Sequence, residues 1–270
     1  MMENIGKFVL GLIIGAGIVG IAAIITIGVP SANSIAVIKI QGVITSSPSL
    51  LSETVSPDDI YGMIQKVEES PYYRAVVFEI NSPGGSVVAS REMAGYVKAM
   101  EKPTVCWLSD VAASGAYWVA SSCDVIVSDP LSITGSIGAT ASYLEFSKLF
   151  DKYGVTYESI TSGENKDMGS PFRNMTSDER ENMEYIVNET FRYFLGEVVK
   201  NRNLTEAQVD QISSGGIFLG KDAIELGLVD RIGSFQEAKS MAKEIAGLDY
   251  AEFVSMKKKG LGLFDLIGMM

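Results

Sequence analysis

The chain has no histidine among its 270 residues. This absence excludes a Ser-His-Asp catalytic triad and any metal site that depends on imidazole ligands. Cysteine is almost as scarce, because Cys106 and Cys123 are the only two and they do not form a C-x-x-C pair. A cysteine-cluster zinc site is therefore excluded and a disulfide framework is disfavoured, so we expect two buried, apolar thiols. The sequence indicates neither a metal nor a cofactor.

Basic residues are also in short supply. The chain has 22 Lys and Arg against 33 Asp and Glu, which gives a net charge of -11, and its one basic run is Lys257–Lys259. Nucleic-acid binding depends on Lys and Arg meeting phosphates, so this balance argues against a nucleic-acid partner. With 47% hydrophobic residues, the chain has ample material for the core of one large domain or two small ones.

Residues 8–29 form a continuous apolar run, and no charged side chain occurs between Lys7 and Lys39. A helix of about 22 residues can cross a hydrocarbon core of about 30 Å. The run is longer than the apolar part of an ordinary signal peptide. This favours an uncleaved membrane anchor over cleavage near residues 31–32 or a buried core helix. The few positive charges before the run predict the N-terminus inside and the bulk of the chain outside the membrane.

The chain from residue 35 onward alternates short apolar, β-branched runs with amphipathic stretches. This pattern predicts βαβ units around a mainly parallel sheet, an α/β fold. The expected strands are 35–44, 75–80, 104–108, 125–127 and 155–160, and the expected helices are 57–70, 87–100, 145–153, 176–201 and 234–246.

Glycine-rich turns follow several of these strands, and parallel sheets place their sites at such strand ends. Ser114 stands between Ala113 and Gly115, where a strand passes into a helix. A serine there is lightly crowded, and the free N–H groups of the helix N-terminus lie beside it. Ser114 is therefore a candidate nucleophile, although small residues also suit an ordinary turn.

Without histidine, a serine nucleophile needs a lysine or a carboxylate as its base. Lys166 lies in an irregular polar segment, 161–171, directly after an expected strand, whereas most other lysines lie on helix faces or in turns. A lysine base must be neutral, which burial favours. Glu164 and Asp167 would oppose this if they faced the amine, but neighbours on an extended segment point to opposite sides. We therefore prefer Lys166.

Four motifs carry a family resemblance through their order and spacing: Asn81–Gly85, Asp110–Tyr117, Thr134–Gly138 and Ser162–Pro171. With them, residues 35–254 resemble the signal peptide peptidase SppA family in its short, single-unit form. The resemblance implies a membrane-anchored serine protease with a ClpP/crotonase-like βαβ superhelical fold.

The resemblance also implies residue roles. Ser114 would be the nucleophile, Lys166 the general base and Ser136 the hydroxyl that orients the lysine. Gly85 would offer an oxyanion-hole N–H, and Gly115 would be a second donor. The family usually has Gly-Gly after the serine, whereas this chain has Gly115-Ala116.

The implied function is a Ser-Lys endopeptidase that degrades remnant signal peptides and other apolar peptides. Its subunits would form a homo-oligomeric ring or dome with sites built from neighbouring protomers. The expected location is the cell membrane, single-pass, with the catalytic domain extracytoplasmic. The alternatives are a stomatin-operon-type membrane protease, a crotonase-like CoA-binding enzyme, and a non-catalytic membrane-anchored ring scaffold.

The C-terminal tail and three possible glycosylation sites lie outside these four motifs. The C-terminal tail is basic and then apolar, which fits a disordered end, a membrane contact or a segment that docks in a peptide groove. Three Asn-x-Thr sequons, at Asn174, Asn188 and Asn203, would allow glycosylation outside the cell.

The expected domain division is a tail at 1–7, a transmembrane anchor at 8–29, a linker at 30–34, the peptidase domain at 35–256 and the C-terminal tail at 257–270.

Overall fold

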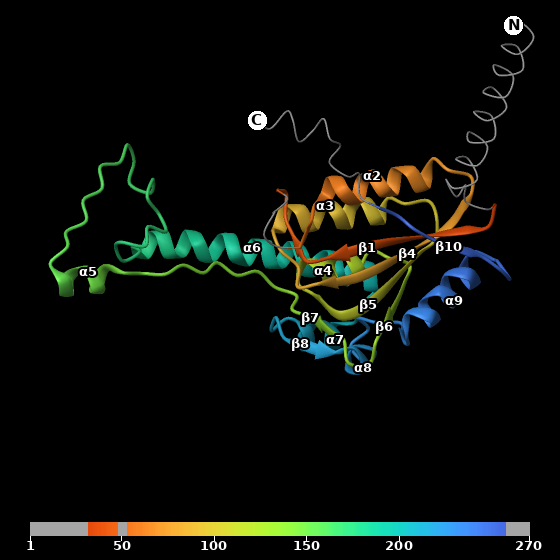
Figure 1. Ribbon diagram of the computed structural model, residues 1–270. Coiled ribbons are helices and arrows are strands. Elements are labelled where there is room, and N and C mark those ends of the chain that lie inside the picture. The colour runs from red at the N-terminus through yellow and green to blue at the C-terminus, as the bar shows by residue number, and fades with distance from the viewer. Residues whose placement is uncertain (1–31, 48–52, 258–270) are drawn as a thin grey trace, which may run out of the picture.

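The computed structural model describes residues 32–47 and 53–257 (Figure 1). The expected anchor at 8–29 and the C-terminal tail beyond Lys257 lie outside these residues. Across the two described ranges, no helix is long and apolar enough to cross a membrane.

A parallel sheet forms the centre of the molecule, as the strand and helix alternation predicts. Its main path runs in the order β10-β1-β4-β5-β6-β9, and every neighbouring pair on this path is parallel. The central strands are mainly apolar and buried, as expected for a sheet that is covered on both faces. The strands of this path are β1 (Ser34–Gln41), β4 (Tyr73–Ser82), β5 (Thr104–Ala113), β6 (Val125–Ser128), β9 (Arg231–Ile232) and β10 (Glu252–Ser255).

Strand β5 is longer than predicted, because Asp110–Ala113 continues the strand instead of forming a turn. Its first half pairs with β6 and its second half with β7 (Ile133–Gly135). Strand β8 (Ile217–Leu219) then runs antiparallel to β7. The added length of β5 thus brings the chain to a second set of partners, at the end where Ser114 lies.

Helices cover both faces of the sheet (Figure 1). Helices α2 (Pro57–Glu68), α3 (Val87–Lys98) and α4 (Gly115–Ala120) lie on one face, and α9 (Phe235–Ile245) lies on the other. Each face has its own apolar core, one of which includes Phe78 and Tyr117 and the other Val77 and Met241. The remaining short elements are β2 (Val43–Ile44), β3 (Thr54–Val55), α7 (Glu206–Ile212) and α8 (Gly220–Ala223).

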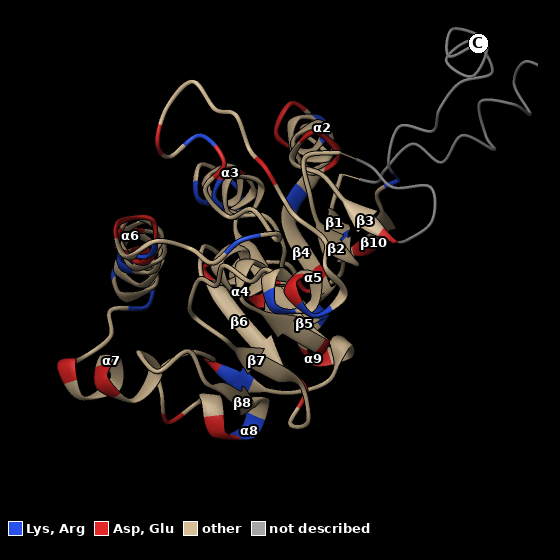
Figure 2. Cartoon of the chain, turned by 90° about the vertical axis from the view of Figure 1, so that its left-hand side faces the viewer, with Lys and Arg blue, Asp and Glu red and all other residues tan. Residues whose placement is uncertain are grey.

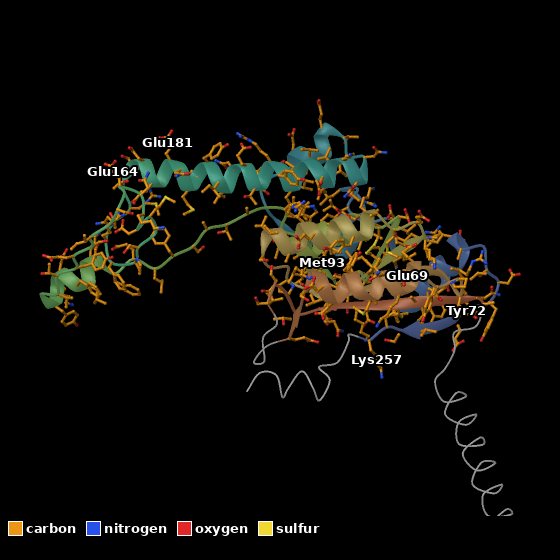
Figure 3. All side chains as sticks on the ribbon, turned by 90° about the horizontal axis from the view of Figure 1, so that it is seen from above. Glu69, Tyr72, Met93, Glu164, Glu181 and Lys257 are labelled. Atoms are coloured by element: carbon orange, nitrogen blue, oxygen red, sulfur yellow. A yellow bond between two sulfur atoms is a disulfide. The ribbon has the colours of Figure 1, made fainter. Side chains whose placement is uncertain are left out.

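An arm, residues 139–185, projects to one side of this body (Figures 1 and 3). It contains α5 (Ser147–Tyr153) and the N-terminal part of α6 (Ser177–Arg202). Figure 3 shows Glu164 and Glu181 at the far end of the arm from Met93, which lies in the body. The C-terminal part of α6 packs on the body, where Phe194 stacks on Trp118 with ring centroids 4.4 Å apart.

The arm corrects one expected element. Residues 155–160 alternate like a strand but form none, and Ile160 is fully exposed. A strand needs a hydrogen-bonded neighbour, and this segment lies away from the sheet (Figure 1). The prediction of a strand there is wrong for the described chain.

The expectation of two free thiols is also wrong. Cys106 and Cys123 are both buried, as expected, but a disulfide joins them. Cys106 lies in β5 and Cys123 follows α4, and the chain turns back at Ser114 so that their Cα atoms are 6.0 Å apart. This separation suits a disulfide. The bridge closes a loop that contains the candidate nucleophile.

Candidate active site

Ser114 occupies the turn between β5 and α4 in an unusual backbone conformation. Its φ is 52° and its ψ is -127°, which is costly for a residue with a Cβ. Two backbone bonds hold the turn: the Ser114 N–H donates to the Gly135 carbonyl at 2.8 Å, and the Ser114 carbonyl accepts from Trp118 N–H at 3.0 Å. The side chain is half-buried. Nucleophilic serines often occupy strained strand-to-helix turns of this kind, where the surrounding hydrogen bonds hold the backbone in place.

The loop with Gly84 and Gly85 lies directly beside this turn. Gly84 has a φ of 93°, and a Cβ on it would be 2.6 Å from the Gly115 nitrogen. A Cβ on Gly85 would be 1.9 Å from the Ile44 carbonyl oxygen. The Ile44 N–H donates to Gly84 O, and the Ile44 carbonyl accepts from Ser86 N–H, both at 2.9 Å. Only glycine fits at these two positions.

Polar side chains connect the first two motifs. The side-chain Oδ1 of Asn81 accepts from Val111 N–H at 3.3 Å, and the side-chain Nδ2 of Asn81 donates to Asp110 at 3.1 Å. The Ser82 hydroxyl accepts from Gly84 N–H at 3.1 Å. These bonds fix the Asn81–Gly85 loop against the end of β5. The spacing that suggested a shared site therefore has a structural cause.

Ser136 enters the same region from the third motif. It also has a positive φ, 51°, and its N–H donates to the Gly216 carbonyl at 2.7 Å. Gly135 precedes it with a φ of 83°. Two successive residues in this conformation turn the chain sharply after β7 and place Ser136 beside the serine turn.

One cavity of about 370 Å³ collects four of the five predicted site residues. Its size is within the usual range for ligand pockets. Trp118 and Phe194 give it an apolar side, while the glycine and serine residues give it a polar one. It is lined by Gly85, Val87, Ser90, Ser114, Gly115, Trp118, Ser136, Gly138, Ala139, Thr140, Thr190, Phe194, Ser214 and Gly215.

The fifth predicted residue, Lys166, is elsewhere. It lies on the arm, two residues from Glu164, which Figure 3 shows far from the body. No lysine is among the described residues that line the Ser114 cavity. The structure does not bring Lys166 to Ser114 within one chain, so their pairing stays a prediction.

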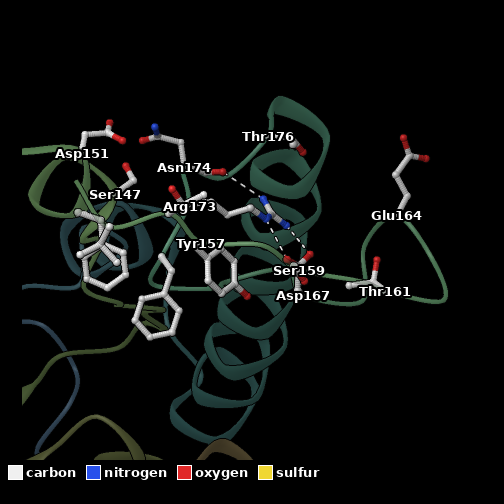
Figure 4. Close-up of a pocket in the computed structure, with 14 residues that line it drawn as sticks. Ser147, Asp151, Tyr157, Ser159, Thr161, Glu164, Asp167, Arg173, Asn174 and Thr176 are labelled. Carbon is white, nitrogen blue, oxygen red and sulfur yellow. Dashed lines mark hydrogen bonds and ion pairs between the residues drawn. The ribbon is translucent and has the colours of Figure 1, made fainter. Parts of the chain in front are cut away.

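The arm has a cavity of its own, of about 620 Å³, between α5, the 155–167 segment and the start of α6 (Figure 4). Arg173 crosses it. Its Nε and Nη2 donate to Asp167 at 3.0 and 2.7 Å, and its Nη1 and Nη2 donate to Glu179 at 2.9 and 2.5 Å. These bonds lower the pKa of Asp167 and the pKa of Glu179, each to about 2.

Two residues near these cavities, Ser90 and Arg173, were not predicted from the sequence. Ser90 is 1% exposed, its hydroxyl has no hydrogen-bond partner in the described structure, and a Cβ on Gly115 would be 2.1 Å from its Oγ. A serine on the apolar face of helix 87–98 is the signal that could have found it. Arg173 gives no such signal, because only the folded arm shows which carboxylates it binds.

Comparison with known proteins identifies the family of this chain. The family model of peptidase family S49 matches residues 97–249, more than half of the chain. The chain belongs to peptidase family S49. It is a serine peptidase, as the resemblance implied, and the S49 match includes the Ser114 turn, Ser136 and the whole arm.

Individual S49 relatives cover most of the chain. A provisionally named protease of Methanocaldococcus jannaschii is 35% identical over 76% of this chain and 67% of its own. A provisionally named signal peptide peptidase SppA of Enterococcus faecium is 32% identical over 86% and 69%. Protease 4 of Haemophilus influenzae is 33% identical over 79% of this chain, which spans only 35% of that longer protein. Membership of the SppA family is therefore confirmed.

A solved structure supports the fold. A mutant of the 1510-N membrane-bound stomatin-specific protease, in complex with a substrate peptide, matches 88% of this chain and 99% of its own with a TM-score of 0.54 and 15% identity. This likeness confirms the predicted α/β architecture, and together with the S49 membership it supports the ClpP/crotonase-like fold that the resemblance implied.

Proposed function

We propose that the chain is a membrane-anchored endopeptidase that uses Ser114 and Lys166 to degrade remnant signal peptides and other apolar peptides. The observation that carries the proposal is the Ser114 cavity, where a strained serine stands beside two glycines, Gly85 and Gly115, that line the same space. In the described part of the chain, the Gly85 N–H has no backbone acceptor, so it is available to an oxyanion.

The chemistry follows from these groups. The neutral amine of Lys166 takes the proton from the Ser114 hydroxyl as Oγ attacks the peptide carbonyl. The Gly85 N–H, with Gly115 as the second donor, stabilises the tetrahedral oxyanion. The ammonium then protonates the leaving amine nitrogen as the C–N bond breaks. Water attacks the acyl-enzyme, gives its proton to the amine, and Ser114 leaves with that proton.

Lys166 would come from a neighbouring subunit. Two observations support this: the Ser114 cavity has no lysine among its described lining residues, and Lys166 lies on a projecting arm. The arm also exposes large apolar side chains that water would disfavour, and a second subunit could cover them. They include Leu144 and Tyr153, each 71% exposed, and Ile160, 101% exposed.

The apolar lining of the Ser114 cavity supports the proposed substrate class, and the disulfide supports the proposed location. Trp118, Phe194 and Val87 give the Ser114 cavity an apolar wall that suits membrane-derived peptides. The Cys106–Cys123 disulfide is typical of an oxidising compartment, which supports a catalytic domain outside the cytoplasm. The apolar run 8–29 would be the anchor.

Hydrolysis of a fluorogenic apolar peptide by the full chain in detergent tests this function. Ser114→Ala and Lys166→Ala are each expected to reduce kcat by at least about a thousandfold while the size of the assembly stays unchanged. Full activity in either variant would contradict the dyad. An inert wild type that assembles normally would favour the scaffold alternative.

A further inference from the structure

Lys166 must be neutral to act as a base, yet acidic residues surround it in the sequence. Its segment carries Glu164 and Asp167, and carboxylates near an amine stabilise the protonated, inactive form. Glu179, at the start of α6, adds a third carboxylate, which is 1% exposed. A base that must be neutral therefore lies in a part of the chain that carries several carboxylates.

Arg173 forms ion pairs with two of these carboxylates, those of Asp167 and Glu179. It binds Asp167 through two nitrogens, as Figure 4 shows, and Glu179 through two, so both acids direct their oxygens at the guanidinium. Bidentate pairs of this type are geometrically fixed and strong. Figure 4 shows Glu164 on the opposite side of the segment, pointing away from Arg173.

The same bonds fix the position of the Lys166 segment. Glu179 also accepts from Thr176 N–H at 2.9 Å, and Glu179 N–H donates to the Thr176 hydroxyl, which completes the capping box of α6. Asp167, the residue after Lys166, is thus attached through Arg173 to the first turn of a 26-residue helix. That helix continues into the body of the molecule (Figure 1).

We propose that Arg173 is a positioning residue for the general base: it anchors the Lys166 segment to α6 and offsets one of the two negative charges of Asp167 and Glu179. This inference rests on the proposed function, because it takes Lys166 as the base. The other charged or titratable groups that line this cavity are Asp151 of α5, Tyr157 and Glu164. None of these three carries a positive charge, so within the cavity lining Arg173 supplies the neutralising one.

The test is the pH dependence of kcat/KM between pH 6 and pH 10 for the full chain. Arg173→Gln leaves the carboxylates of Asp167, the residue after Lys166, and of Glu179 without their cation, so the midpoint of the activity rise should move up by about one pH unit, a tenfold loss at pH 7 that is largely recovered at pH 10. Asp167→Asn changes the net charge of the Arg173, Asp167 and Glu179 cluster from about -1 to zero, because Arg173 keeps its pair with Glu179, so its midpoint should move down. The double variant Arg173→Gln/Asp167→Asn should lie between the two.

Arg192→Gln is the matched control, because Arg192 is an exposed arginine of α6 that pairs with Glu189, three residues before it on the same helix. Its profile should be that of the wild type. Equal loss at every pH in Arg173→Gln and Asp167→Asn would overturn the proposal and leave a purely structural role. If Arg173→Gln does not assemble, the downward shift in Asp167→Asn still decides the question, and an unshifted profile rejects the proposal. Activity in Lys166→Ala would reject the proposed function itself, whereas an inactive Lys166→Ala with unshifted profiles would reject only the role of Arg173.

Discussion

At the scale of single residues, the backbone of Ser114 is the most informative feature. A φ of 52° is easy for glycine and costly for any residue with a Cβ, so the fold accepts strain to present this hydroxyl. Ser114→Gly and Ser114→Ala both remove Oγ, and only alanine keeps the strain. We expect the glycine variant to be the more stable by about 1 kcal/mol, the reverse of the usual order of these residues.

Urea denaturation of the two inactive variants measures this difference. Comparing them with each other, and not with the wild type, removes the effect of losing the hydroxyl. If Ser114→Ala proved equally or more stable, the positive φ would not be a strained conformation.

Gly85 allows a second test at this scale. A Cβ there would be 1.9 Å from the Ile44 carbonyl oxygen, so Gly85→Ala must displace the loop and its N–H. We expect kcat to fall by about 10²–10³-fold, as for the loss of one oxyanion donor. Gly95→Ala is the control, because nothing lies within 4 Å of a Cβ at that exposed position of α3. It should keep its activity and gain up to about 1 kcal/mol in stability from helix propensity.

At the scale of elements, local chemistry made the helices predictable. Thr176 and Glu179 form a capping box at the start of α6, and α6 ends at Arg202, close to the expected end at 201. Long-range pairing was harder to predict. β10 and the second half of β5 are recognisable only from their partners, and the 155–160 segment has a strand-like sequence with nothing in the described chain to pair with.

The Arg173 cluster gives the start of α6 a pH dependence. The pKa of Asp167 and the pKa of Glu179 fall from ordinary values of 3.8 and 4.5 to about 2. Because a lowered carboxyl pKa stabilises the folded form, this contribution is complete above about pH 5 and is lost as the pH falls towards 2. The first turns of α6 should therefore open on acidification before the body unfolds.

Amide hydrogen exchange at pH 5 and pH 2.5, corrected for intrinsic rates, measures this opening. The first two turns of α6 should lose protection at the lower pH, while the segment around Phe194 and Val198, which is buried on the body, should keep it. In Arg173→Gln the first turns should exchange quickly at both pH values. Equal protection of the wild type at both values would contradict the prediction.

At the scale of the whole molecule, the surface carries acidic residues on α2, α6 and α7 with basic ones between them (Figure 2). The motifs predicted which residues gather around Ser114, because loops at the ends of neighbouring parallel strands must meet. Sequence could not show that Lys166 lies on a projecting arm, because the arm is set by the length and direction of α6. Whether Lys166 serves the Ser114 of another subunit is therefore a question about the assembly.

Mixing two inactive variants answers that question. Ser114→Ala subunits keep Lys166, and Lys166→Ala subunits keep Ser114, so a site shared between neighbours is intact when the two kinds meet in the right order. Random exchange in an equal mixture should restore roughly a quarter of the wild-type activity per site. A site built within one subunit would restore none, because each chain then lacks one half of its own dyad.

The exchange must be shown to occur, since subunits that never mix would also give no activity. Wild type mixed with the double variant Ser114→Ala/Lys166→Ala supplies this control. With shared sites, exchange should lower the summed activity from a half to roughly a quarter of the wild-type value, whereas sites within one subunit would keep the half. Restored activity in the first mixture, with the fall in the second, would place each active site at a contact between the arm of one subunit and the Ser114 cavity of the next.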